Sequence, residues 1–306
     1  MSKISFLTFL FSFIYTLFYI VIYHNYQKGD FESYHNVFLE IQNLDFWDSY
    51  VYYHRLLSAS EPIYFLILFS SSKIIPHLFF KVILCFILFY LFYNKIVITL
   101  KVSNFFSFFI IFILLSTNYY ILALITELER LCVAIIFILL YFKYRNVFFQ
   151  YFSLLSHFQI IVIFVHKFVY SAILSLCKLK FNLYFVLNAI IFSAILFLAK
   201  DHLIQKLQFY FDFNDGHIPH DLILFFFVPF IFKDLNLFIY LTLFFIISLI
   251  VGSSRLNILC FFIILYSLSQ KRKTFNRDSF IIVLLTYFSL KGFLFINNIY
   301  LFGRGY

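Results

Sequence analysis

Residues 119–142 read YYILALITELERLCVAIIFILLYF, an apolar stretch with its only charges near the middle. Arg130 is one of those charges. A charged side chain at membrane depth costs at least about a few kcal/mol unless it faces water or a partner, so such residues commonly mark functional sites. The stretch therefore predicts membrane-spanning helices and makes Arg130 the first candidate functional residue. The alternative is that Arg130 extends to the membrane interface or pairs with Glu127 or Glu129.

The composition of the whole chain is that of a membrane protein. Of 306 residues, 64% are hydrophobic and only 12% are charged, and the mean hydropathy is +0.96. Soluble domains carry about 25% charged residues, which excludes that class. The net charge of +9 predicts cytoplasmic connections rather than nucleic-acid binding, because Lys and Arg collect on the cytoplasmic side of membrane proteins. The four cysteines lie within apolar runs without metal-ligand spacing and predict no metal site.

Apolar runs close to the length that spans a bilayer, about 20 residues, recur along the chain. We expect an all-α, polytopic integral membrane bundle of about 11 transmembrane helices, within a range of roughly 9 to 12. The run 221–232 is short and is expected to be tilted or half-inserted, and 62–72 is expected to form a partial helix that dips into the membrane. The expected crossings are 4–22, 75–93, 104–122, 124–142, 147–165, 166–178, 181–199, 221–232, 235–251, 255–270 and 279–297.

Charge predicts the orientation of these crossings. Residues 23–61 carry six acidic and two basic side chains, and we assign them to a first extracytoplasmic loop. Residues 200–221 form the second. The basic connections at 143–145 and 271–277 are assigned to the cytoplasm. We therefore expect a single transmembrane domain over 1–306, with a cytoplasmic N-terminus and an extracytoplasmic C-terminus.

Three arginines, Arg55, Arg130 and Arg255, fall at the exterior face in this topology. A guanidinium is permanently charged and binds phosphate through two parallel N–H groups, so the cluster predicts a clamp for a diphosphate headgroup. His157 lies near the middle of the expected span 147–165 and should face the bundle interior. A packing role, bonded to a hydroxyl or carbonyl group, and a proton-transfer role are both open for it.

The order of these residues resembles the EpsG-type branch of the Wzy polymerases, which build bacterial O-antigen, capsule and exopolysaccharide. The segment Arg130-Leu131-Cys132-Val133-Ala134, the basic turn 143–145 and His157 carry the resemblance. Before them, GDFESY at 29–34 resembles the pattern of the family's first exterior loop, and EPIY at 61–64 resembles its entry to the second span. The resemblance covers about residues 1–165. Leu131 replaces the family's usual Gln, and Phe158 and Gln159 replace the basic or Ser residues that often follow the histidine.

The resemblance implies a fold similar to GT-C-type membrane glycosyltransferases and a glycosyl transfer, inverting or retaining, at the outer face of the bacterial cytoplasmic (inner) membrane. The growing glycan on undecaprenyl pyrophosphate would move onto the non-reducing end of a second lipid-linked repeat unit. The partners would be this donor, this acceptor, the lipid bilayer and a chain-length regulator protein, with no cofactor and no metal.

Such a transfer needs a base for the acceptor hydroxyl, a cation for the leaving pyrophosphate and a lateral groove for the lipid. The resemblance implies Asp30 or Glu61 as the base, with Arg130 and Arg255 as the clamp.

Other classes of function stay open beside this one. Another polyprenyl-phosphate-dependent glycosyltransferase or a ligase would use the same kinds of residue. A lipid-linked glycan flippase or transporter would bury charges along a central cavity and would usually show repeat symmetry between its halves, which is not evident here. A membrane O-acyltransferase could use His157 as its base, and a structural assembly protein needs no buried arginine. The polymerase is the expectation that the residues favour.

Overall fold

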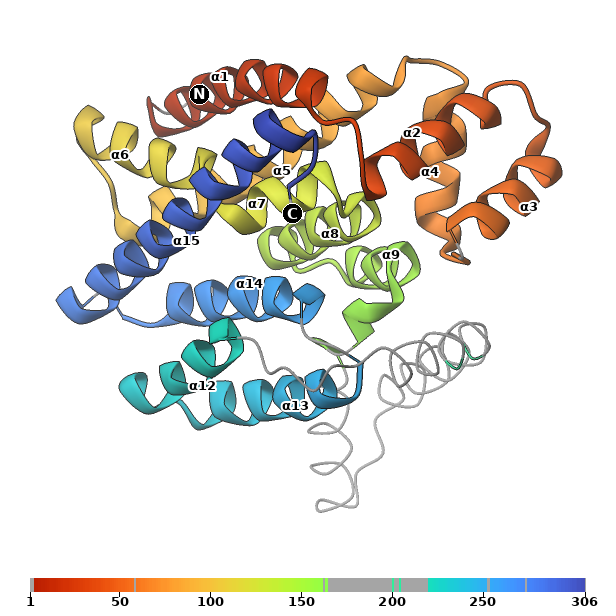
Figure 1. The fold of residues 1–306 in the computed structure, drawn as a ribbon. Coiled ribbons are helices and arrows are strands. Elements are labelled where there is room, and N and C mark those ends of the chain that lie inside the picture. The colour runs from red at the N-terminus through yellow and green to blue at the C-terminus, as the bar shows by residue number, and fades with distance from the viewer. Residues whose placement is uncertain are drawn as a thin grey trace. The chain divides into compact units, whose positions relative to one another are not determined.

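The structure, a computed structural model, describes residues 3–57, 59–161, 163–164, 200, 204, 220–251, 254–272 and 274–305. The regular elements in these residues are helices, and no strand occurs among them, which confirms the expected all-α class. The chain divides into two compact units, one formed by Met1–His157 with Arg272–Tyr306 and the other by Phe158–Lys271. Figure 1 draws the helices of both.

The first unit is built around an antiparallel pair of long helices. Its helices are α1 (Lys3–Asn25), α2 (Asp30–Ile41), α3 (Phe46–Leu57), α4 (Pro62–Ser72), α5 (His77–Leu100), α6 (Phe105–Ser116), α7 (Tyr119–Thr126), α8 (Glu129–Tyr144), α9 (Val147–Ser156) and α15 (Phe275–Phe302). The pair is α1 and α5: Phe9 of α1 packs on Phe86 of α5, and Tyr23 near the end of α1 bonds to His77 at the start of α5. The polar loop between them therefore begins and ends at the same end of the pair.

Fewer helices than expected are long enough to cross a membrane. Among the described residues, only α1, α5 and α15 reach that length with sufficient hydropathy. Helices α6 and α7 pass the same test only together, and they are bent by 53° at Thr117-Asn118. The described helices therefore support a helical membrane protein with three or four spans, and the expected count of about 11 is wrong for them.

Polar residues that end helices inside apolar runs explain this difference. The side chain of Asn118 accepts hydrogen bonds from the Tyr120 and Ile121 backbone N–H groups, which starts a new helix before the end of the expected span 104–122. The next break falls at Glu127-Leu128, before α8. Helix α9 ends at Ser156, so His157 caps a short helix in an extended conformation instead of lying inside a span over 147–165. The mean hydropathy of a span-length window does not detect a helix end inside that window.

The expected first extracytoplasmic loop is largely helical. Helix α2 has Asp30 and Glu32 in its first turn, where the helix dipole favours acidic groups. It buries one stripe of side chains at helical spacing: Phe31, Tyr34, Val37, Phe38 and Ile41. Helix α3 follows, and α4 starts at Pro62 in the first helical turn, where a missing N–H costs nothing. Helix α4 has the same bounds as the predicted partial helix 62–72.

The C-terminal helix packs closely on the bend between α6 and α7. A Cβ added at Gly292 would lie 1.7 Å from the Thr117 carbonyl oxygen, so only glycine allows this approach. The Thr117 and Ser289 hydroxyls share a hydrogen bond of 2.5 Å beside it. Beyond the end of α15, the Gly303 carbonyl accepts two hydrogen bonds. The donors are the backbone N–H groups of Gln27, at 2.9 Å, and Lys28, at 3.1 Å. The C-terminal ends of α1 and α15 therefore meet, as Figure 1 shows.

The second unit contains three described α-helices, α12 (His220–Phe232), α13 (Leu235–Val251) and α14 (Ser254–Gln270). Asp234 joins the first two: its Oδ1 accepts the Leu237 N–H at 3.0 Å, and its Oδ2 lies 3.0 Å from Lys271 Nζ. The predicted spans 166–178 and 181–199, and nearly all of the predicted second exterior loop 200–221, lie outside the described residues.

Candidate functional site

Side chains from separate segments of the first unit lie around the guanidinium of Arg130 and its partner carboxylate. We call Arg130, Glu61, His157, Tyr34 and Tyr53 the arginine cluster. Arg130 Nη1 donates to both oxygens of Glu61, at 3.0 and 2.9 Å, and Nε donates to the Tyr34 hydroxyl at 3.0 Å. His157 Nδ1 lies 3.2 Å from Glu61 Oε1, and the Tyr53 hydroxyl donates to Oε2 at 3.3 Å. All five side chains are buried.

Each member of the arginine cluster lies either at the end of a helix or on the buried face of one. Glu61 is the residue before Pro62, where α4 starts, and the backbone N–H of Ser60 also donates to its carboxylate. Arg130 lies in the first turn of α8, and His157 is the first residue beyond α9. Helices α8 and α9 form a hairpin fixed by a hydrogen bond of 3.0 Å from the Ser153 hydroxyl to the Ala134 carbonyl. Positions 61, 130 and 157 therefore meet although they are far apart in sequence.

A second group of charged side chains lies beside the first. We call Glu129, Lys81, His77 and Tyr64 the lysine cluster. Glu129 Oε2 lies 3.0 Å from Lys81 Nζ and 3.5 Å from His77 Nε2, and Oε1 accepts the Tyr64 hydroxyl at 2.6 Å. The Glu129 side chain is fully buried. A buried carboxylate is tolerated when a cation and hydrogen-bond donors compensate its lost hydration, and Lys81 and Tyr64 do so here.

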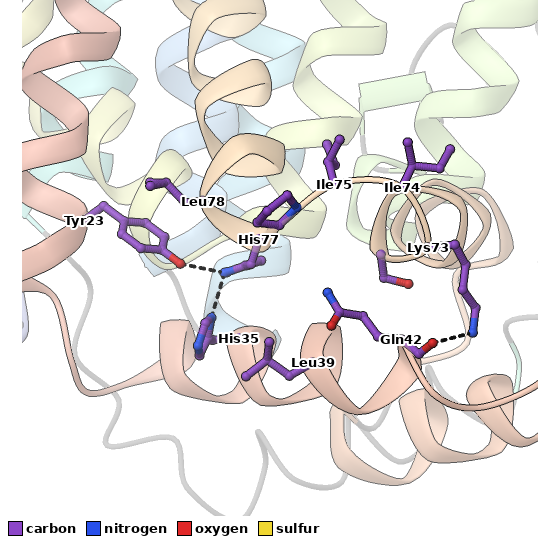
Figure 2. A pocket seen from close by; sticks show the side chains of 11 residues that line it. Tyr23, His35, Leu39, Gln42, Lys73, Ile74, Ile75, His77 and Leu78 are labelled. Atoms are coloured by element: carbon purple, nitrogen blue, oxygen red, sulfur yellow. Dashed lines mark hydrogen bonds between the residues drawn. The ribbon is translucent and has the colours of Figure 1, made fainter.

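The lysine cluster adjoins an open pocket of about 610 Å³. Figure 2 shows His77 at its wall, with its Nδ1 hydrogen-bonded to both the Tyr23 hydroxyl and His35 Nδ1. The distances are 3.1 and 2.9 Å. Apolar and polar side chains share the rest of the lining: Leu39, Gln42, Ser72, Lys73, Ile74, Ile75, Pro76 and Leu78. Burial and the adjacent His77 lower the pKa of His35, which favours a neutral imidazole at pH 7.

Neighbouring residues link the two clusters. On α8, Glu129 belongs to the lysine cluster and Arg130 to the arginine cluster. On α2, His35 bonds to His77, and Tyr34 bonds to Arg130. The rings of Tyr34 and Tyr64 also pack edge to face across the two groups. The arginine cluster and the pocket wall are therefore adjacent parts of one buried polar region.

The structure brings three of the predicted site residues together, and it places Asp30 and Arg55 at exposed positions of the same unit. Glu61, Arg130 and His157 are in direct contact. Asp30 is the first residue of α2 and is exposed. Arg55 is exposed on α3, with its guanidinium 5.8 Å from the centre of the Tyr52 ring. Arg255 starts α14 in the second unit, and its side chain lies outside what the structure describes. The predicted clamp of Arg130 and Arg255 therefore stays a prediction.

Sequence analysis missed most of the lysine cluster and the tyrosines that bind both carboxylates. The signal for Lys81 was present, because it is an ionisable residue inside the apolar run 75–93, like Arg130 in its own run. His77 lies near the start of the same run. The roles of Tyr53 and Tyr64 depend on how α3 and α4 fold back, which no spacing in the sequence shows.

The arginine cluster can bind an anion through the part of Arg130 that Glu61 leaves open. Nε and Nη1 are occupied, whereas Nη2 makes no hydrogen bond to any residue in the described ranges. A guanidinium nitrogen held in place by its neighbours is well suited to a phosphate oxygen. The described residues contain no group of three or more His, Cys, Asp or Glu side chains that could hold a metal ion. No protein-family model, curated protein or solved structure matches the chain.

Proposed function

We propose that the chain is a polymerase of undecaprenyl-pyrophosphate-linked oligosaccharide repeat units, acting at the outer face of the bacterial cytoplasmic membrane. The observation that supports this most is the contact among Glu61, Arg130 and His157. These positions belong to three separate segments that resemble the EpsG-type polymerases. A buried ionic cluster in a membrane protein is also where function is expected first.

In this reaction Arg130 stabilises the leaving pyrophosphate. Charge builds on the pyrophosphate as the bond to the sugar breaks, and a fixed cation in a buried site stabilises that charge strongly. Glu61 holds the guanidinium by two contacts, so the fork is oriented before the substrate binds. The lipid tail of the donor would lie in the bilayer beside the unit.

Glu61 is better suited to positioning than to taking the acceptor proton. A carboxylate accepts about four hydrogen bonds, and Glu61 contacts Arg130, Tyr53, His157 and the Ser60 N–H. Its role as the base and that of Asp30 remain predictions.

Chain length of the surface glycan tests the proposal. In a strain that lacks this gene and any second polymerase, the wild-type gene should restore long glycan. The Arg130→Ala gene, expressed at the same level, should leave lipid A core with a single repeat unit where the pathway ends in lipopolysaccharide. The exposed Arg55→Ala serves as a comparison, because it distinguishes a buried arginine from one at the surface. Long glycan in the Arg130→Ala strain would refute the proposed role of Arg130.

One observation favours a second candidate, a transporter of lipid-linked glycans. Buried chains of Glu, His and Lys, such as Glu129, His77 and Lys81, also serve as proton relays in transporters. Loss of a transporter would leave repeat units facing the cytoplasm and no repeat at the cell surface. A single surface repeat in the deletion strain therefore identifies a polymerase, and none identifies a transporter.

A further inference from the structure

The base that the proposed reaction needs has no clear place in the arginine cluster. Glu61 is occupied by donors, and Asp30 lies at the exposed start of α2. The adjacent pocket offers another pair of groups, because His35 and His77 both line it. A histidine at the pocket wall is therefore the remaining candidate for the base in the described part of the first unit.

We propose that the pocket receives the acceptor glycan and that His35 is the catalytic base, with His77 and Glu129 as positioning residues behind it. The inference rests on the proposed polymerase function and adds to it the acceptor subsite and the base. It stands on three contacts in series: His35 Nδ1 to His77 Nδ1 at 2.9 Å, His77 Nε2 to Glu129 Oε2 at 3.5 Å, and Glu129 to Lys81 at 3.0 Å.

The tautomers follow from these contacts. His77 Nε2 faces the Glu129 carboxylate at 3.5 Å, and the Tyr23 hydroxyl and His35 Nδ1 both bond to His77 Nδ1. We therefore assign the proton of His77 to Nε2, toward Glu129, which makes Nδ1 the acceptor. His35 then donates its Nδ1 proton to His77, and its Nε2 carries the lone pair. A neutral His35 with an unprotonated Nε2 at the pocket is the form that a general base requires.

The O–H bond of the acceptor sugar breaks, and its proton goes to His35 Nε2. The oxygen forms a bond to the anomeric carbon of the donor, whose bond to pyrophosphate breaks and leaves its electron pair on the phosphate. The new imidazolium is stabilised by sharing its Nδ1 proton with His77, which faces Glu129. Arg130 lies one residue from Glu129 and stabilises the leaving group.

The pocket itself suits a sugar. Its volume of about 610 Å³ falls within the range of small-ligand sites, about 300–1,000 Å³. Gln42 and Ser72 offer polar groups, and Leu39 and Ile75 offer apolar surface for the carbon faces of a ring. Figure 2 shows this polar and apolar lining around the two histidines.

The full chain in liposomes, supplied with lipid-linked repeat units extracted from the deletion strain, tests the inference. His35→Ala should slow polymerisation about 100-fold or more, the usual effect of losing a general base. Added imidazole should restore part of the rate, because the truncated side chain opens space in the pocket. Rescue by substituted imidazoles should increase with their basicity. His54→Ala, which removes an exposed histidine of α3, is the matched control and should keep the wild-type rate.

The dependence of the rate on pH separates catalysis from folding. Protonation stops a base, so the wild-type rate should fall in acid as His35 becomes charged, and His77→Gln should shift this acid limb. The groups that face His35 in this network are Tyr23, His77, Lys81 and Glu129, and Lys73 lies across the pocket. A rescued His35→Ala protein should instead follow the pKa of the added imidazole.

The outcomes distinguish the two proposals. A His35→Ala protein that polymerises at the wild-type rate, or a slow one that imidazole does not rescue, overturns the inference while the wild-type activity upholds the polymerase. If the His35→Ala protein does not fold, His35→Gln replaces it in the test, provided that its thermal unfolding is like that of the wild type. A wild-type protein that does not join the repeat units overturns the polymerase and, with it, the inference.

Discussion

The start of α8 and the turn between α12 and α13 show two different uses of charge in this chain. Glu129 and Arg130 are buried and bind side chains from several other elements of the first unit. Asp234 is partly exposed and, with Lys271, fixes a local turn of the second unit. Burying a charged side chain costs free energy, and a stable fold does not require it. A turn can instead be fixed by an ion pair at the surface, which costs little. The difference locates the candidate function in the first unit.

The strongest way to break this comparison is to separate Glu61 from Arg130. Arg130→Met leaves the Glu61 carboxylate buried without its cation and should lower the free energy of unfolding by about 3–5 kcal/mol. Glu61→Leu combined with Arg130→Met removes both charges and should recover most of that loss. Unfolding in detergent micelles measures both. Polymerisation should remain absent in the double variant, since stability returns and the cation does not. Purely additive losses would show that the two side chains do not act as a pair.

Gly292→Val tests the packing that holds the first unit together. A side chain at this position collides with the Thr117 backbone, which cannot rotate away, so the expected loss is at least about 1–3 kcal/mol. Leu290→Ala is the matched control, because Leu290 lies on the exposed side of α15. Thermal unfolding of both proteins in the same detergent is the measurement. Equal stability of the two would mean that α15 does not approach the bend as described.

Lys73→Met tests an exposed charge that bonds to the end of a helix. Lys73 Nζ donates to the carbonyls of Ile41, Gln42 and Leu44, at 2.9, 2.9 and 2.6 Å, and so caps the end of α2. Its loss should cost on the order of 1 kcal/mol, because these carbonyls can turn to water. Hydrogen exchange at the end of α2 should increase, while Lys28→Met, at another exposed lysine, should leave it unchanged. An unaltered exchange rate in Lys73→Met would argue against the cap.

Lys271→Ala should have the smallest effect, at most about 1 kcal/mol, since exposed pairs contribute little. Burial alone would raise the pKa of Asp234, but bonds from the Leu237 N–H and Lys271 outweigh it and lower this pKa. A lowered pKa in the folded state stabilises the protein above the pKa of the unfolded chain, and this stabilisation is lost as pH falls through the folded pKa. Lys271→Ala should therefore reduce the acid sensitivity of unfolding. Loss of several kcal/mol would place the pair with the buried clusters instead.

The sequence predicted the all-α class better than it predicted where individual helices begin and end. Composition sufficed for the helical class, and Glu61-Pro62 correctly predicted the start of the short helix 62–72. The number of spans among the described helices was overestimated because Asn118 starts a helix, and Ser156 ends one, inside an apolar run. An asparagine at such a position is a recognisable start signal, so part of this error was avoidable.

Three members of the arginine cluster, Glu61, Arg130 and His157, were predicted from the sequence, and their contacts with one another were not. Arg130 stood out because a charge in an apolar run needs a partner, and the structure provides Glu61 as that partner. The same reasoning applied to Lys81 would have pointed to the second cluster. The pairing of Glu129 with α5 and of Arg130 with α4 depends on how helices fold back on one another. Spacing along one chain does not contain that information.

The most direct test of the proposed function is the chain length of the glycan made by Arg130→Lys at wild-type expression. Lysine keeps the positive charge, but one ammonium group cannot replace both Nη1 at Glu61 and Nε at Tyr34 while a further nitrogen binds phosphate. We expect a folded protein in the membrane and a surface glycan that stops at a single repeat unit. Long glycan from the lysine variant, in a strain without a second polymerase, would show that Arg130 supplies only charge and would contradict its role as the pyrophosphate clamp.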